Sequence, residues 1–442
     1  MINSRHYRYW PVAILAVLAV GAVVALNRPA FIGSKTVIRF WHGFTSKDGE
    51  AMLQLVRDFN AANPGIEVQV QRIPWGTYYN KLFVAGLAGR APEVFISHTT
   101  MLSRLERGKF LQPVDDLIAS SGATLAHDFD HNIWSAVEVE GRHLGIPLDV
   151  HPLGLFYNRR LLKEAGLVDA QGAPRPPANW PEFVEAITKL NRDVNGDGRN
   201  DQWGFMFEGT PFIAAYTFML QEGGSILSPD GAQARIDTPE NIAGLKKLRQ
   251  LTVEMKLVPK PGDETAWTSF LQGRVGLFLG GVFMIGALER QSSVDYAVAP
   301  VPRFGPEARI WGDSHVLCLP RISDGKRAEA AWRFVRYLSD HGVAWARGGQ
   351  VPARISQRQS PEFKAMTAQA VFAASVESVR YLPNVPATAA IVRDVRFACE
   401  EVLRGGALPE EALAKAQVAV EATLERDRET AAAIRLLEAS KL

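Results

Sequence analysis

The stretch 40–71, FWHGFTSKDGEAMLQLVRDFNAANPGIEVQVQ, decides the fold because two structural periods follow each other in it without a break. Its middle part has apolar side chains at the spacing i, i+3, i+4 and i+7 of one helix face, at Met52, Leu55, Val56 and Phe59. The segment 66–73, IEVQVQRI, alternates apolar and polar residues as a half-buried strand does. With the apolar run TVIRFW at 36–41, this order predicts a strand–helix–strand unit.

The same alternation extends through most of the chain. Further strands are expected at 93–98 and 274–281, and further helices at 78–88, 101–107, 158–167, 180–191, 331–338 and 409–438. Strands that alternate with helices in this way predict an α/β fold, in which mixed, mostly parallel sheets are flanked by helices. At 442 residues the chain is too long for one ordinary hydrophobic core, so two lobes are expected.

The composition is that of a globular protein, with 47% hydrophobic and 22% charged residues. The formal net charge is +2 and the basic residues form no stripe, which argues against a nucleic-acid binder. The two cysteines, Cys318 and Cys399, lie too far apart in the chain to indicate a zinc site. Two buried thiols are expected, and a single disulfide remains the alternative.

The N-terminus differs from the rest of the chain. Arg5, His6 and Arg8 precede the apolar run VAILAVLAVGAVVAL at 12–26, which is typical of a secretory signal. The run is short for a membrane-spanning helix, which needs about 20 residues. Two interpretations of residues 1–34 stay open, a cleaved signal peptide and an uncleaved N-terminal anchor. Both place the body of the protein outside the cytoplasm, in the periplasm or beyond it.

An ordered set of segments resembles the family 1 extracellular solute-binding proteins, the maltose-binding-protein-like proteins of ABC importers for sugars and glycerol phosphate. The segments are 40–71, WGTYYNKLFVAGLAGRAPEVFISH (75–98), LQPVDDL (111–117), GIPLDVHPLGLFYNRRLLKEAGL (145–167), WPEFVEAITKL (180–190), FLQGRVGLFLGG (270–281) and GGQVPAR (348–354). The resemblance implies a two-lobe periplasmic-binding-protein-like fold of type II, whose lobes close over a ligand. It implies a first lobe from 35–147 and 302–350, and a second from 148–301 and 351–442.

Candidate ligand-binding residues follow the expected strands, because ligands of open α/β sheets lie beyond the carboxyl ends of the strands. These residues are Trp41, His42, Trp75, Tyr78, His98, Asp149, His151, Gly280, Gly281 and Met284. The resemblance adds Trp267 to these candidates. Trp311 and His315 are included because they flank an expected return crossing between the lobes. Arg354 is the last candidate. Aromatic faces with a carboxylate and imidazoles suit a sugar or polyol. Core packing of the rings and a hinge hydrogen-bond network at Asp149 and His151 are the alternatives.

The expected function is the capture of a carbohydrate or polyol, such as a sugar, an oligosaccharide or a glycerol-phosphate-like solute, for the permease of an ABC importer. We expect no catalysis and no required cofactor. The first alternative is a secreted carbohydrate-active enzyme, which needs two carboxylates, Asp149 with Glu50 or Glu208. The second alternative is a membrane-tethered interaction protein.

The segment 193–203, DVNGDGRNDQW, resembles half of a calcium loop, with oxygen-bearing side chains at positions 1, 3, 5 and 9. Gly204 stands where an EF-hand has its bidentate Glu, and no second such unit follows, so a calcium sensor is excluded. We expect a structural Ca²⁺ held by Asp193, Asn195, Asp197, the carbonyl of Arg199 and Asp201. A turn that needs no metal is the alternative.

Overall fold

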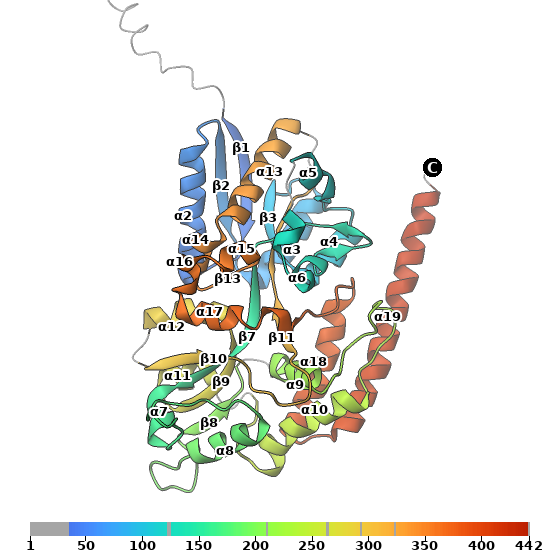
Figure 1. The fold of residues 1–442 in the computed structure, drawn as a ribbon. Helices are drawn as coiled ribbons and strands as arrows, with labels where there is room; N and C mark the ends of the chain where they lie inside the picture. Colours follow the sequence, from blue (N-terminus) through green and yellow to red (C-terminus); the bar gives the residue numbers. More distant parts are fainter. Residues whose placement is uncertain are drawn as a thin grey trace, which may run out of the picture.

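The computed structural model describes residues 35–121, 125–208, 211–261, 265–291, 294–321 and 324–440. These residues form two α/β lobes, which lie one above the other in Figure 1 and are joined by extended segments. The predicted signal peptide or anchor lies outside the described residues. Among the residues described, no helix is both long and apolar enough to cross a membrane.

The first lobe contains the predicted strand–helix–strand unit. Strand β1 (Thr36–His42) pairs in parallel with β2 (Ile66–Arg72), and α2 (Ser46–Ala62) connects them. The sheet order is β2-β1-β3-β12-β6, with β3 Val94–His98, β6 Ile146–Pro147 and β12 His315–Cys318. The helices around it are α3 (Trp75–Leu87), α4 (Leu102–Arg107), α5 (Asp115–Ser120), α6 (His131–Ser135), α13 (Gly325–Asp340), α14 (Gly342–Ala346), α15 (Ile355–Arg358) and α16 (Pro361–Lys364).

The second lobe is built around β7 (Asp149–Asn158), which pairs antiparallel with β9, β10, β11 and β13. Its other strands are β8 (Trp203–Met206), β9 (Val275–Gly281), β10 (Tyr296–Ala299), β11 (Ile310–Asp313), β13 (Val351–Pro352) and β14 (Val379–Arg380). Its helices include α7 (Arg159–Glu164), α8 (Trp180–Leu190), α9 (Phe212–Gln221), α10 (Pro239–Arg249), α11 (Ala266–Leu271), α12 (Ile285–Gln291), α17 (Thr367–Ala373), α18 (Thr388–Arg404) and α19 (Pro409–Ala439). The sheets are mixed, as predicted, but the expectation that they are mostly parallel is wrong. Among the described strands, β1–β2, β1–β3, β8–β9 and β11–β14 pair in parallel, and the other pairs in these two sheets are antiparallel because β7 and β12 run against their neighbours.

The chain passes between the lobes at several places. β6 leads into β7, β11 leads into β12, and the segment after α14 enters β13 of the second sheet before it returns to α15. Residues 310–313, expected in the first lobe, therefore belong to the second sheet, because β11 pairs with β7 and β14. Residues 355–364, expected in the second lobe, form α15 and α16, which pack against α14 of the first lobe. Strand pairing and helix packing place these two segments differently from the expected boundaries.

The lobes contact each other on both sides of the crossing strands. On one side, α12 lies against α2, and Arg290 binds Glu50 at 2.9 Å. On the other side, Arg107 of α4 forms two hydrogen bonds of 2.6 and 2.7 Å with Asp427. Asp427 belongs to α19, the long C-terminal helix that runs from the second lobe up beside the first in Figure 1. These contacts join the two lobes directly, in addition to the segments that cross between them.

The cysteines are buried and free, as expected. Cys318 belongs to β12 of the first lobe, and Cys399 belongs to α18 of the second. Burial raises the pKa of both thiols above the usual range, to about 12 for Cys399.

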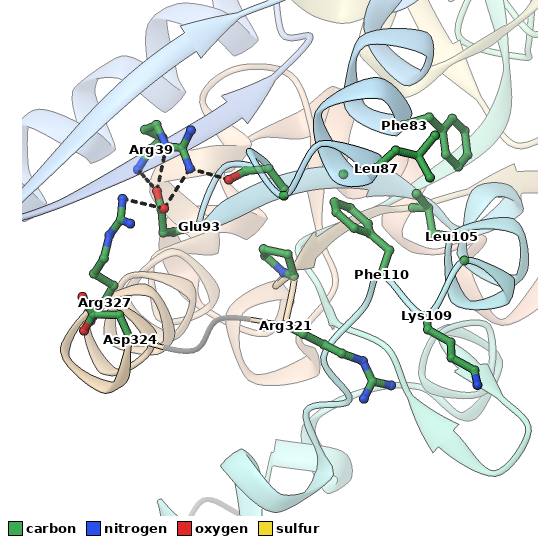
Figure 2. Close-up of a pocket in the computed structure, with 15 residues that line it drawn as sticks. Arg39, Phe83, Leu87, Glu93, Leu105, Lys109, Phe110, Arg321, Asp324 and Arg327 are labelled. Atoms are coloured by element: carbon green, nitrogen blue, oxygen red, sulfur yellow. Dashed lines mark hydrogen bonds and ion pairs between the residues drawn. The ribbon is translucent and has the colours of Figure 1, made fainter. Parts of the chain in front are cut away.

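A buried carboxylate joins α13 to the start of β3. Glu93 is 3% exposed, accepts hydrogen bonds from the backbone and guanidinium of Arg39, and also contacts Arg327 at 2.7 Å (Figure 2). Burial alone would raise the pKa of Glu93, but the hydrogen bonds and charge of Arg39 lower it below its usual value. A carboxylate with a lowered folded-state pKa stabilises the protein above its unfolded pKa, and that contribution is lost as the pH falls.

We predict that Glu93→Gln lowers the free energy of unfolding at pH 7 by about 1–3 kcal/mol, because the two guanidinium groups lose their charged partner. The difference from the unmodified protein should shrink below about pH 4, where the unfolded carboxylate takes up protons. Chemical denaturation between pH 3 and pH 8 measures both effects. Glu329→Gln, at an exposed residue of the same helix as Arg327, should change the free energy little at any pH. A pH-independent effect of Glu93→Gln would contradict the prediction.

Candidate functional site

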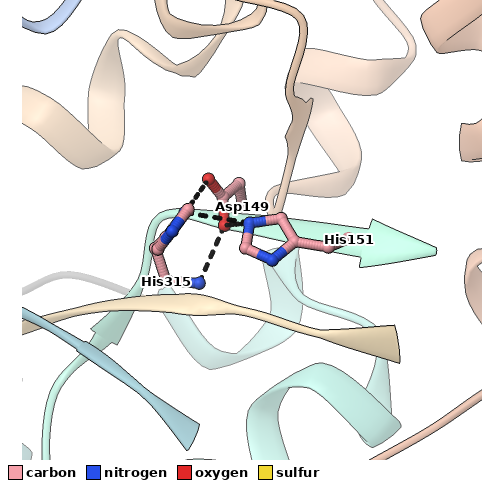
Figure 3. Close-up of side chains that lie close together, drawn as sticks. All are labelled: Asp149, His151 and His315. Carbon is pink, nitrogen blue, oxygen red and sulfur yellow. Dashed lines mark hydrogen bonds and ion pairs between the residues drawn. The ribbon is translucent and has the colours of Figure 1, made fainter. Parts of the chain in front are cut away.

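The two crossing strands bring Asp149, His151 and His315 into direct contact (Figure 3). Oδ1 of Asp149 accepts from the backbone N–H of His315 at 2.9 Å and lies 2.9 Å from Nε2 of His151. Oδ2 of Asp149 lies 2.8 Å from Nδ1 of His315 and accepts from Nε1 of Trp345 at 2.8 Å. We call these four residues the junction cluster. It joins both crossing strands to α14.

The charges of the junction cluster follow from its burial. Burial would raise the pKa of Asp149, but the two imidazoles hold it far below its usual range. Burial would lower the pKa of His151, but Asp149 raises it above its usual value. The pKa of His315 falls to about 3, because burial and the neighbouring His151 outweigh the same carboxylate. We assign the proton of neutral His315 to Nδ1, since Asp149 only accepts, and this leaves Nε2 as an acceptor.

Among the described residues, the acidic and imidazole side chains close enough to share one ion are Asp149, His151 and His315. Each oxygen of Asp149 already accepts two hydrogen bonds, as described above. A cation there would have to displace two of these donors. The arrangement therefore fits a fully bonded network that holds its imidazoles in place.

Aromatic rings of the first lobe surround the junction cluster. Trp75 stacks on His315, with ring centroids 5.8 Å apart and an angle of 12° between the planes, and its edge contacts His98 at 4.7 Å. His98 stands opposite His315 in the β3–β12 pairing, and its Nδ1 lies 2.6 Å from the hydroxyl of Tyr79. Phe44 lies edge-on against His315 at 4.7 Å. The predicted Trp75, His98, Asp149, His151 and His315 thus meet at one place.

A cavity of about 110 Å³ lies in the second lobe beside this cluster. Four predicted residues line it, namely Gly280, Gly281, Met284 and Trp311. Phe283 also lines the cavity, is 49% exposed, and places its ring edge-on to His151 at 6.3 Å. Gly281 makes room for that ring, because a Cβ there would lie 2.1 Å from it. Phe283 therefore links the second-lobe cavity to the junction cluster.

Two predicted ligand contacts, Trp41 and Tyr78, lie in the core of the first lobe and not among the rings at the junction cluster. Tyr78 is fully buried, and its hydroxyl donates to the backbone oxygens of Trp41 and Ile96. Trp41 is 7% exposed, packs in the same core cluster, and carries the ammonium of Lys81 at 5.0 Å over its ring. Both rings belong to the core cluster between the sheet and helices α3 and α4.

Arg354, another predicted ligand contact, forms ion pairs within the first lobe. Its guanidinium binds the carboxylates of Asp128, at 2.6 Å, and Asp340. Partial burial would lower the pKa of Arg354, but these bonds raise it. The positive charge of Arg354 is therefore balanced by carboxylates of the first lobe. The segment that follows β13 is thereby anchored to the loop before α6.

His42 and Trp267 take intermediate positions. His42 is buried beside Phe44, whose backbone N–H donates to its Nδ1 at 3.1 Å, while Nε2 has no partner. Burial, with a smaller effect of Arg72, lowers the pKa of His42 to about 4. The backbone N–H of Trp267 donates at 2.6 Å to Glu208, which lines the second-lobe cavity.

Several residues at the junction carry no signal in the sequence. Trp345 lies in a helix, where the sequence does not show that its ring reaches the junction. Phe44 and Tyr79 have aromatic neighbours in the sequence that are equally suitable as ligand contacts. Asp313 lies in a strand that was expected in the first lobe. Asp48, near the start of α2, has its pKa raised to about 6 by burial and by the charge of Asp149. Phe283 follows Gly280 and Gly281 in the glycine turn after an expected strand, which was the one available hint for it.

The pair of carboxylates that a glycosidase needs is not assembled from the expected residues. Glu50 points to the surface, where it binds Arg290. Glu208 lines the second-lobe cavity, where burial raises its pKa despite the hydrogen bond from Trp267. Asp149 is fully bonded within the junction cluster.

A second cavity, of about 370 Å³, lies at the opposite end of the first-lobe sheet, where β3 begins (Figure 2). It is lined by Leu87, Phe110 and the Arg39–Glu93 pair, among others. No predicted site residue lines it.

The loop 193–201 is exposed and folded on its own side chains. The carboxylate of Asp193 accepts from the backbone of Gly196, Asp197 and Gly198, and that of Asp201 accepts from Val194 and Asn195. Gly196 and Gly198 have φ values of 78° and 85°, which favour glycine. These bonds describe the metal-free turn, and the structural Ca²⁺ stays a prediction.

We predict that Ca²⁺ at 1 mM raises the melting temperature of the protein by several degrees relative to a chelated sample, because an ion bound to the folded loop stabilises it. Differential scanning calorimetry in the presence of EDTA or CaCl₂ measures the shift. Asp197→Asn should abolish the shift, whereas Asp230→Asn, in another exposed turn, should preserve it. Equal melting temperatures with EDTA and CaCl₂ would establish the metal-free turn.

The comparisons with known proteins agree with this architecture. Residues 44–345 match the family model described as bacterial extracellular solute-binding protein. The maltotriose-binding protein of Pyrococcus abyssi is 24% identical over 86% of this chain and 80% of its own length. An sn-glycerol-3-phosphate-binding periplasmic protein of Agrobacterium fabrum is 21% identical over 69% of this chain and 70% of its own length.

The solved structures show the same fold. The maltose/maltodextrin-binding domain of Bdellovibrio bacteriovorus bound to maltotriose superposes with a TM-score of 0.74, at 23% identity, and covers 88% of this chain and 100% of that one. The family model covers more than half of the chain, and its relatives are binding proteins. The chain therefore belongs to the bacterial extracellular solute-binding protein family.

Proposed function

We propose that this protein captures a carbohydrate or polyol between its two lobes and delivers it to the permease subunits of an ABC importer. The observation that carries the proposal is the convergence of Trp75, His98, His151 and His315 at the crossing strands. Rings of this kind pack against the C–H faces of a sugar, and imidazole nitrogens exchange hydrogen bonds with its hydroxyl groups. The named ligands of the relatives, maltotriose and sn-glycerol-3-phosphate, belong to the same class.

The charges near the junction favour an uncharged member of this class. Arg354, the one guanidinium among the candidate residues, is bound by two carboxylates. Asp48 and Glu208 both have raised pKa values, because burial disfavours their charged forms. A phosphate group would meet these carboxylates without a free guanidinium among the candidates, whereas sugar hydroxyls can donate to them.

The mechanism that we propose involves no chemical change in the solute. The solute binds at the junction cluster of the open protein, and the second lobe then closes over it. Contacts between α12 and α2 belong to the closed form, so bound solute shifts the population toward that form. The permease would recognise closure through surfaces of both lobes. The N-terminal segment would export the protein, and anchor it if uncleaved.

Isothermal titration calorimetry against matched solutes tests the function. Maltotriose, glycerol and glycerol 3-phosphate form the first panel, and product analysis of each mixture detects turnover. Binding of maltotriose without hydrolysis supports the proposal, and hydrolysis would establish a carbohydrate-active enzyme instead. Absence of binding to a wider panel of saccharides and polyols would overturn the proposal and favour an interaction protein.

We predict that Trp75→Ala weakens binding of the panel solute by about tenfold or more, because the indole offers the stacking face at the junction. The melting temperature should change modestly, since Trp75 is only half-buried. Trp203→Ala, at a half-buried tryptophan at the start of β8, is the matched control and should leave the dissociation constant unchanged. Equal dissociation constants for the unmodified protein and Trp75→Ala would place the solute elsewhere.

A further inference from the structure

Gln350 is a buried side chain whose hydrogen-bonding groups have no partner. The residue is 0% exposed, and neither Oε1 nor Nε2 forms a hydrogen bond. A buried amide in this state is unusual, because folding removes its water without replacing the lost hydrogen bonds. The position of Gln350 in the fold suggests why its amide has no partner.

Strand pairing puts Gln350 on the same face of the sheet as the junction cluster. Val351 stands opposite Val150 in the antiparallel β13–β7 pair, so Gln350, one residue earlier, comes beside His151. On the other side of β7, Asp313 stands opposite His151. Directly paired residues project from the same face of a sheet. Asp313, His151 and Gln350 therefore form one row across three strands.

This row lies on the ligand side of the second sheet. Leu153, two residues after His151 and on the same face, lines the second-lobe cavity. The opposite face is covered by α17, since a Cβ at Gly154 would meet the ring of Phe372 at 2.4 Å. The amide of Gln350 thus belongs to the side of the sheet that carries the candidate site.

The chain just before Gln350 is covered from both lobes. A Cβ at Gly348 would lie 2.9 Å from the Cα of Asp48 in α2, which belongs to the first lobe. A Cβ at Gly349 would lie 3.1 Å from the backbone nitrogen of Gly286 in α12, which belongs to the second lobe. The ion pairs of Lys47 with Glu289 and of Glu50 with Arg290 hold these two helices together. The contact with α12 comes from the second lobe, so separation of the lobes would uncover that side of the segment.

We propose that Gln350 contacts the solute, and that its unpaired amide makes closure of the lobes unfavourable until solute hydroxyl groups bind it. The inference rests on the proposed function, because it assigns a residue and a control step to the same site. A side-chain amide offers one acceptor and two donors side by side, which matches a pair of neighbouring hydroxyl groups on a saccharide or polyol.

Two other buried polar atoms near the site also lack a hydrogen-bond partner, which supports the same inference. These atoms are Nε2 of His42 and Nε1 of Trp311. Trp311 lines the second-lobe cavity, and His42 stacks on Phe44, which in turn contacts His315. An unpaired group that closure removes from water disfavours the closed, solute-free form by roughly 5- to 100-fold in the open–closed equilibrium. A solute that supplies the missing partners removes this barrier.

Gln350→Met tests the proposal, because it removes both polar atoms at nearly constant volume. Two opposite changes are expected. The dissociation constant for maltotriose, or for glycerol 3-phosphate if that is the panel solute that binds, should rise about tenfold or more. The closed fraction without solute should increase, which small-angle X-ray scattering detects as a smaller radius of gyration. A purely structural role would alter thermal stability and neither of these quantities.

Gln369→Met is the matched control. Gln369 is also buried, but its Nε2 donates to the backbone oxygen of Ala346, so its amide has a partner. This variant should lose stability and keep both the dissociation constant and the solute-free radius of gyration. Gln350→Asn, which keeps a shortened amide, serves if Gln350→Met does not fold, and should weaken binding without increasing solute-free closure.

The outcomes separate this inference from the proposed function. Solute binding by the unmodified protein, with a dissociation constant unchanged within twofold in both Gln350 variants, would overturn the role of Gln350 and leave the function intact. An unchanged solute-free radius of gyration in Gln350→Met would also overturn it, whichever solute binds. Absence of binding by the unmodified protein to every saccharide and polyol tested would overturn both.

Discussion

The buried carboxylate of Asp149 is the interaction on which the rest of the structure depends. It receives hydrogen bonds from the backbone and ring of His315, from the indole of Trp345 and from the ring of His151. A single ion thereby joins both crossing strands and α14 where the two lobes meet. Its burial would be costly without these donors, so carboxylate and imidazoles keep each other in place.

The site and the closure of the lobes share these residues. Phe44, Trp75 and His98 pack around His315 in the first lobe, whereas Phe283 reaches His151 from the second. The rings exclude water and strengthen every hydrogen bond made among them. The same dryness penalises any polar group left unpaired, so a closed cleft of this kind distinguishes a solute that fits from one that does not.

Candidate residues at equivalent positions in the sequence pattern lie in different surroundings in the structure. Trp41 and His98 both end a strand of the first sheet, yet Trp41 faces the helices and His98 faces the junction. The local sequence pattern predicts where a strand ends. The face of the sheet on which a side chain lies, and what that side chain contacts there, depend on the elements that pack on each face. Arg354 illustrates the same limit, because Asp128, which binds it, is 226 residues away in the chain.

The sequence by itself determined the α/β alternation, the strand–helix–strand unit at 36–72 and the buried thiols. These features depend on periodicity and local chemistry, which act over a few residues. Only the tertiary structure decided that His315 meets Asp149, that β11 joins the second sheet, and that Gln350 is sealed without a partner. Each of these depends on segments more than a hundred residues apart, and their contact is settled by the packing and strand pairing of the whole chain.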